Sequence, residues 1–96
     1  METEYITITE FCSSHNIGVD FISALAEEGL ITVTIIESSR RISADQLSDL
    51  EMYTRLRYQM GIGPEGIDAI RNLLERVKAM RAEIEHLKHR LSLYEQ

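Results

Sequence analysis

Apolar residues recur at helical spacing in the first third of the chain, between residues that start and end helices. Thr7 or Thr9 can cap a short first helix, which the pair His15-Asn16 ends. A second helix is predicted from Gly18, serving as an N-cap, to Gly29, which can adopt the left-handed conformation found at helix ends. The pattern therefore predicts two short helices joined by a turn.

The second of these helices is predicted to be amphipathic. Its inward side carries three apolar residues at helical spacing, Ile22, Leu25 and Ala26. Its outer side is expected to present four other residues, Asp20, Phe21, Ser23 and Glu27. This outer side is the surface that the helix would offer to a partner.

A run of β-branched residues follows, which is typical of strands. Residues Ile31 to Ile36 are predicted to form one strand, Glu37-Ser38-Ser39 a turn, and Arg40 to Ile42 the returning strand. An isolated hairpin is marginally stable in water, so we expect this small wing to pack on the helices.

Two further helices are predicted after the wing. Ser43 with Gln46 has the spacing of a capping box, and the apolar positions that follow repeat at helical spacing: Leu47, Leu50, Tyr53 or Thr54, and Leu56. Residues 60–63 end that helix, and Pro64 is suited to begin the last one.

The last helix carries a heptad pattern. Its seam consists of Ile70, Leu73, Val77, Met80, Ile84, Leu87, Leu91 and Tyr94, at alternating steps of three and four residues. So regular a pattern favours a coiled-coil homodimer over packing within the subunit. Charges beside the seam do not decide between a parallel and an antiparallel pair, because each exposed pair contributes only a fraction of a kcal/mol.

Charge is distributed unevenly. The net charge is -6, but residues 1–39 hold seven acids, Glu2 among them, and no lysine or arginine, whereas all ten cations lie between Arg40 and Arg90. Non-specific affinity for nucleic acid comes chiefly from cations that neutralise phosphates. The first part of the chain therefore has the wrong sign for a nucleic-acid surface.

Length and residue types exclude several kinds of chemistry. A chain of 96 residues forms one small core, and it has no apolar run long enough to span a bilayer and no start resembling a signal peptide, so we expect a cytoplasmic protein. Cys12 is a lone cysteine and is expected to be a small buried hydrophobe. His86 and His89 lie three residues apart without a third ligand. We expect neither an enzyme nor a metal, cofactor, membrane or small-molecule substrate.

The order of elements resembles the MerR-type winged-helix regulators. Matching features are Ile6 to Glu10, Ile17-Gly18, Gly29-Leu30, Arg40 and Leu56-Arg57. The resemblance implies a mainly α fold with a small β-hairpin wing and a long C-terminal coiled-coil helix. Residues 1–62 would form a MerR-like winged helix-turn-helix domain and residues 63–96 a dimerisation helix.

One departure from that family bears on function. DNA-reading members carry Leu-Arg-Tyr-Tyr where this chain has residues 22–25, Ile-Ser-Ala-Leu, so Ser23 replaces the phosphate-contacting arginine. The chain is similar to a narrower branch, the CbpM family of chaperone modulators, in the stretch ITITEFC at residues 6–12, the spacing from Ile17 to Gly29, and Gly66-Ile67 ten residues after Leu56-Arg57.

Similarity to the CbpM family implies a binding protein. Its partner would be the J-domain of a DnaJ-like, CbpA-type co-chaperone, whose stimulation of Hsp70 and whose DNA binding it would inhibit. We expect the contact to involve Asp20, Phe21, Glu27, Glu28, Ile36 and Glu37, with Phe21 as an apolar anchor unless it lies in the core. Two alternatives stay open: a MerR-like DNA-binding transcriptional regulator, and a scaffold that acts through its coiled coil alone.

Overall fold

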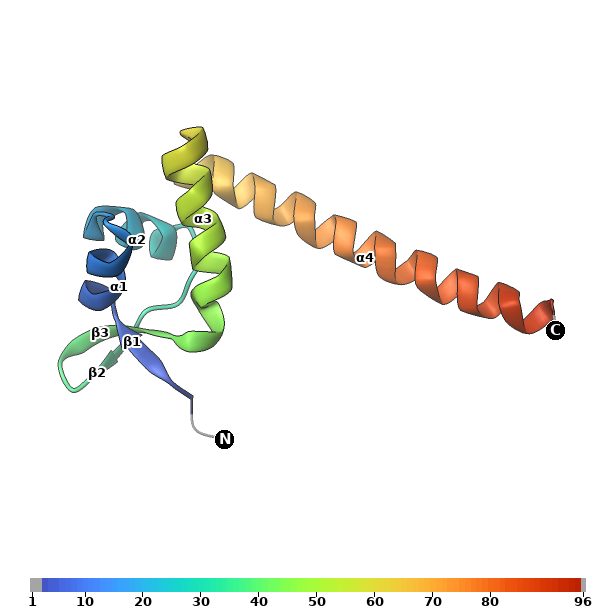
Figure 1. The fold of residues 1–96 in the computed structure, drawn as a ribbon, viewed down its shortest axis with the longest axis horizontal. Coiled ribbons are helices and arrows are strands. Elements are labelled where there is room, and N and C mark those ends of the chain that lie inside the picture. The colour runs from blue at the N-terminus through green and yellow to red at the C-terminus, as the bar shows by residue number, and fades with distance from the viewer. Residues whose placement is uncertain (1–2, 96) are drawn as a thin grey trace.

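The computed structural model describes residues 3–95, which form a head and a long helix that projects from it (Figure 1). The head is built from β1, α1, α2, β2, β3 and α3, and the projecting helix is α4. Their bounds are β1 Tyr5–Thr7, α1 Ile8–His15, α2 Val19–Glu27, β2 Thr34–Ile36, β3 Ser39–Ser43, α3 Leu47–Met60 and α4 Pro64–Tyr94, with a short 3-10 turn at Ala44–Gln46. The protein is thus mainly helical with one small sheet.

Local capping sets the ends of α1 and α2 as the sequence predicts. The Thr7 hydroxyl oxygen accepts a hydrogen bond of 3.1 Å from the Glu10 amide, and Asn16 ends α1 in the left-handed conformation. Gly18 is the N-cap of α2, and Gly29 follows that helix with a φ of 75°. The predicted helix-turn-helix is therefore confirmed.

The sheet has three antiparallel strands in the order β1-β3-β2, one more than predicted. β1 pairs with β3, placing Ile6 opposite Ile42. The wing itself is shorter than predicted: its first strand begins at Thr34, and its turn consists of Glu37 and Ser38, which both have positive φ. Ile31 lies before the strand, and its side chain is buried in the core.

The core lies where α1, α2, β3, α3 and the start of α4 meet. Its buried residues are Ile8, Phe11, Cys12, Phe21, Ile22, Leu25, Leu30, Ile31, Ile42, Leu50, Tyr53 and Ile67. Four of them, Ile22, Leu25, Leu50 and Tyr53, belong to the predicted apolar positions, and Ala26, Leu47 and Leu56 pack partly buried against the cluster. The hydrophobic periodicity thus identifies the inner sides of α2 and α3, although it leaves out the buried Phe21.

Ser43 is the N-cap of the 3-10 turn that leads into α3, as its place in the sequence predicts, but the hydrogen bonds of the predicted capping box do not form. The Gln46 side chain instead donates to the Ser43 hydroxyl and the Thr32 carbonyl, at 2.8 and 3.0 Å, and accepts from the Thr32 amide at 2.7 Å. A 3-10 turn occupies Ala44–Gln46, so α3 begins at Leu47. Gln46 therefore ties the loop before the wing to the loop after it.

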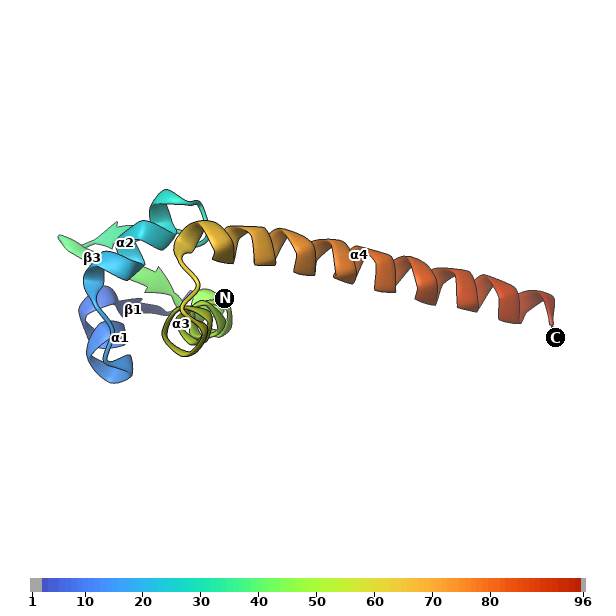
Figure 2. The same ribbon diagram turned by 90° about the horizontal axis from the view of Figure 1, so that it is seen from above.

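Helix α4 joins the head only through its first turns (Figures 1 and 2). Pro64 begins it as predicted, Ile67 is buried in the core, and Arg71 donates a hydrogen bond of 3.2 Å to the Gly29 carbonyl oxygen. The boundary predicted between residues 62 and 63 falls between α3 and α4, although α4 contributes Ile67 to the core of the head. The coiled coil stays a prediction, because it is a contact between two chains.

Candidate functional site

The outer side of α2 is acidic. Asp20, Glu27 and Glu28 are exposed, Ser23 is half-buried, and α2 itself contains no lysine or arginine. Glu2, the first acid of the cation-free run, lies outside the described residues. The side of the helix-turn-helix on which a DNA reader would need cations thus presents carboxylates.

Phe21 does not lie on this outer side, so its predicted orientation is wrong. Its side chain is only 8% exposed, and its ring meets the Tyr58 ring edge-on at 5.7 Å. The reason is geometric: Phe21 lies one helical turn before Leu25 and adjoins Ile22, so it extends the buried stripe of α2. Burial in the core opposes its predicted role as an exposed anchor.

A fourth carboxylate joins those of α2 from another element. Glu65, in the first turn of α4, lines the same hollow as Glu27 and Glu28, which has a volume of about 240 Å³ and also touches Ala24, Gly63 and Pro64. We call Asp20, Glu27, Glu28 and Glu65 the acidic surface. Glu65 is not predictable from the sequence, because only the packing of α4 against α2 brings it there.

The wing presents a different residue from the predicted one. Ile36 is half-buried and Glu37 is exposed, whereas the side chain of Ile35 is 72% exposed. Ile35 pairs with Arg40 across the hairpin, so these two side chains share one side of the sheet, while Ile36 and Ser39 share the other. The exposed apolar residue of the wing is therefore Ile35.

The two arginines of the wing point to opposite sides of the sheet, as alternation along a strand requires. Arg40 reaches toward α2, where its guanidinium donates a hydrogen bond of 3.1 Å to the Ser23 hydroxyl. Arg41 is half-buried on the other side, opposite Thr7 of β1 and Thr34 of β2. Only Arg40 is thus available to the outer side of α2 from the wing.

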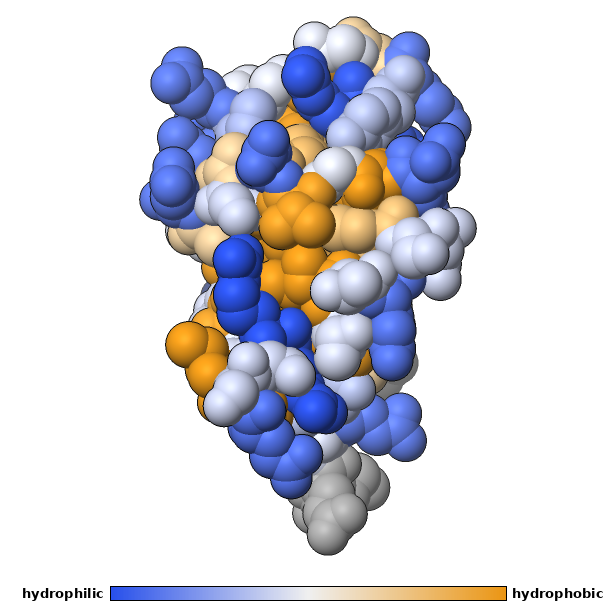
Figure 3. Space-filling model, turned by 90° about the vertical axis from the view of Figure 1, so that its left-hand side faces the viewer, coloured by the Kyte–Doolittle hydropathy of each residue, from blue (hydrophilic) through white to orange (hydrophobic). Residues whose placement is uncertain are grey.

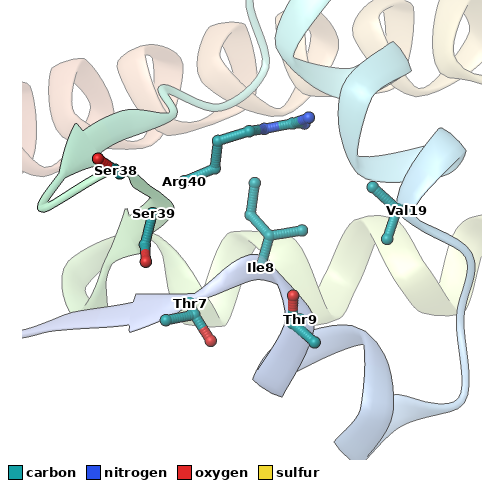
Figure 4. Close-up of a pocket in the computed structure, with 7 residues that line it drawn as sticks. All are labelled: Thr7, Ile8, Thr9, Val19, Ser38, Ser39 and Arg40. Atoms are coloured by element: carbon teal, nitrogen blue, oxygen red, sulfur yellow. The ribbon is translucent and has the colours of Figure 1, made fainter.

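A second hollow lies beside Arg40, between the helices and the wing (Figure 4). It has a volume of about 360 Å³ and is lined by Thr7, Ile8 and Thr9 at the start of α1, Val19 of α2, and Ser38, Ser39 and Arg40 of the wing. We call it the wing groove. The end of the head opposite α4 carries a band of hydrophobic surface between hydrophilic margins (Figure 3).

Two buried groups have altered acidity. Burial raises the pKa of the Cys12 thiol, and burial followed by the Asp49 carboxylate raises the pKa of Tyr53. Within residues 3–95, no group of three or more histidine, cysteine or acidic side chains is placed to hold a metal ion. A buried thiol with a raised pKa is a poor nucleophile, which agrees with the prediction that Cys12 is part of the core.

The heptad seam on α4 is exposed along most of its length. Ile70 is half-buried, and the other seven seam residues are exposed, from 37% at Val77 to 81% at Tyr94. Contiguous apolar surface on this scale marks an interaction site in a water-exposed protein. No helix within residues 3–95 combines the length and apolarity needed to cross a bilayer.

Comparison with known proteins agrees with this architecture. The family described as MerR HTH family regulatory protein matches residues 6–89, which run from β1 through most of α4. Comparison with curated proteins and with solved structures found no significant match. Because the family match covers far more than half of the chain, the protein belongs to the MerR HTH family of regulatory proteins.

Proposed function

We propose that this MerR-like regulatory protein is a chaperone modulator of the CbpM type. Its acidic surface binds the J-domain of a DnaJ-like, CbpA-type co-chaperone, and binding inhibits both the stimulation of Hsp70 and the DNA binding of that co-chaperone. One observation carries the proposal: the outer side of α2, where a helix-turn-helix protein meets DNA, holds exposed carboxylates and no cation of its own.

Charge complementarity supports a basic protein partner. Asp20 and Glu27 lie about two turns apart on one side of α2, and Glu28 and Glu65 continue the negative surface onto α4. J-domains present a basic helix to Hsp70, as the resemblance implies, and such a helix can lie along a row of carboxylates. Opposite surface charges raise the association rate and exclude acidic partners.

The hollow at Glu27, Glu28 and Glu65 can hold the end of one long basic side chain. Its floor includes Ala24 and Pro64, against which the methylene stem of a lysine or arginine can pack while its charge meets the carboxylates. A partner cation buried there would contribute more than one at the rim, where solvent screens the interaction.

We propose further that the protein is a cytoplasmic homodimer held by the heptad seam of α4. Helix α4 projects from the head after its first turns, so most of the seam lies away from the head (Figures 1 and 2). A second copy of α4 can therefore cover the seam without contacting the carboxylates of α2. A dimer would then carry two acidic surfaces and bind two J-domains.

The test is a calorimetric titration of the protein with a purified J-domain. Asp20, Glu27 and Glu28 are exchanged together for Lys, which reverses the charge of exposed positions and leaves the core unchanged. In the control, Asp45, Glu85 and Glu95 are replaced together by Lys. These three residues are exposed and lie outside both the acidic surface and the seam. Both variants change the net charge equally.

We expect the first variant to bind at least about tenfold more weakly than the wild type, and the control to bind within about threefold of it. Wild-type affinity should also fall with rising salt, because exposed charges are screened over about 8 Å at physiological ionic strength. If the first variant binds as tightly as the wild type and still suppresses Hsp70 stimulation, the acidic surface is not the recognition surface.

A DNA-binding transcriptional regulator is the second candidate, favoured by family membership and by Arg40 and Arg41 in the wing. Two arginines per chain supply at most four cations in a dimer, below the roughly six to ten phosphate contacts of a salt-dependent reader. A gel shift at low salt should therefore show no specific complex at micromolar protein. A retained band that weakens steeply with salt would favour the regulator instead.

A further inference from the structure

We propose that the wing groove is a second docking site, for a short extended segment of a protein partner that carries one carboxylate between aliphatic side chains. The carboxylate would pair with Arg40, and the aliphatic side chains would pack on Ile8, Val19 and Ile35. This site adjoins the acidic surface at Asp20 but shares no lining residue with the hollow at Glu27, Glu28 and Glu65, and the proposal does not depend on the identity of the partner bound there.

The polarity of the groove favours a peptide. Its lining combines the aliphatic side chains of Val19, which is 44% exposed, and Ile8, which is almost fully buried, with hydroxyl-bearing residues from two segments, Thr7 and Thr9 on one and Ser38 and Ser39 on the other (Figure 4). Hydroxyl groups both donate and accept hydrogen bonds, which suits the alternating N–H and C=O groups of an extended backbone. One guanidinium stands at the edge of this lining.

Arg40 is positioned to receive a carboxylate. One of its nitrogen atoms donates to the Ser23 hydroxyl, which holds the guanidinium between the wing and α2, and the other donors of its planar fork stay available. A carboxylate can accept two of these donors in parallel, the geometry for which arginine is best suited.

The surrounding charges limit what the groove accepts. Asp20 follows Val19 and Glu37 precedes Ser38 in the chain, so one acid stands next to the groove residue of α2 and another next to those of the wing. A segment with a single carboxylate can reach Arg40, whereas a strand of closely spaced phosphates would meet these acids as well. The charge pattern therefore favours an acidic-aliphatic peptide over nucleic acid.

The apolar surface extends beyond the groove, which favours a macromolecular partner over a small molecule. Ile35 lies on the same side of the wing as Arg40 and is 72% exposed, and hydrophobic surface continues across this end of the head (Figure 3). The turn that carries Ser38 holds two non-glycine residues, Glu37 and Ser38, at positive φ. A two-residue hairpin loop of type I′ has this conformation at both positions, so the turn itself sets the place of Ser38 beside the groove.

The test is an NMR titration of the full-length ¹⁵N-labelled protein with the capped peptide acetyl-Ala-Leu-Glu-Leu-Ala-amide. A matched peptide carries Gln in place of Glu. We expect the Glu peptide to shift the amide resonances of Ile8, Val19 and Ser39 with a dissociation constant of about 1 mM, and the Gln peptide to bind about fivefold more weakly.

Two variants locate the site. Arg40→Gln removes the guanidinium and should weaken binding of the Glu peptide about fivefold, and Val19→Ser should weaken both peptides because Val19 is an exposed part of the groove lining. Arg55→Gln, an exposed cation on α3, is the control and should bind as the wild type does. Dispersed amide spectra show that each variant is folded.

Three results would overturn the proposal. The Glu peptide could leave the groove resonances unshifted, the Gln peptide could bind equally well, or a short DNA duplex at low salt could shift those resonances where the peptide does not. The last result would make the groove a phosphate site. Each result leaves the acidic surface untouched, since its own test uses other residues.

Discussion

Replacing Phe21 by Ala tests the placement of this side chain in the core. The ring is 8% exposed and contacts the Tyr58 ring edge-on. A buried phenylalanine covers about 150–250 Å², which corresponds to about 4–6 kcal/mol at 25 cal/mol per Å², and the measured cost of such truncations is about 3–5 kcal/mol. We expect a loss of about 4 kcal/mol, a large part of the roughly 5–14 kcal/mol available to a chain of this length.

Thermal melts followed by circular dichroism measure this loss. The melting temperature of Phe21→Ala should fall by roughly 15–30 °C. The two proteins are compared at the same concentration, because dimerisation would shift the melting temperature by mass action. Val19→Ala, at an exposed position two residues earlier in α2, is the control, and its melting temperature should fall by only a few degrees. A double-mutant cycle with Tyr58→Leu should give a coupling of about 0.5–1.5 kcal/mol. If Phe21→Ala melts like the wild type, the ring is not part of the core and the anchor hypothesis returns.

Three further predictions follow from the seam and the buried groups. Changing Ile84 and Leu87 together to Asp places charges in the seam, so light scattering should report monomers or an unfolded chain; an unchanged mass and melt would exclude the seam as the dimer contact. Burial and the Asp49 carboxylate raise the pKa of Tyr53 in the folded state. The neutral phenol therefore contributes its full stabilisation below about pH 10, and this stabilisation is lost as the pH rises through the higher pKa of the folded state. Tyr53→Phe should therefore flatten the alkaline decline of the denaturant midpoint, and an equally steep decline would exclude Tyr53 as its cause. Cys12 should react with a thiol reagent at a rate that tracks the unfolded fraction, and rapid reaction of the native protein would contradict its burial.

Features set by neighbours in sequence were predictable. Thr7 caps α1 through an amide three residues away, and Gly29 and Pro64 act through their own backbone preferences. The inner sides of α2 and α3 follow from apolar periodicity. The residues that make these contacts lie only a few positions apart in the sequence, so residue types at fixed spacing are enough to predict them.

Features set by distant neighbours were not predictable. β1 is three residues long and exists because β3 supplies its hydrogen-bonding partner, and Gln46 bonds to Thr32 in a different loop. In the candidate site, the acids of α2 could be identified from the sequence, whereas Glu65 joins them only through the packing of α4. Phe21 was misplaced because a residue at the edge of an apolar stripe faces inward or outward according to its neighbours.

The attachment of α4 through Ile67 and Arg71 gives one continuous helix two different folding behaviours. Its first turns share the core of the head and should exchange their amide hydrogens as slowly as α3 does. The remaining turns have no tertiary support from the head, and most helical stability in proteins comes from tertiary packing rather than from helix propensity. When another chain does not cover the seam, these turns should fray and become open to proteolysis. Dilution would therefore shorten the folded part of the molecule from its C-terminal end while the head stays intact.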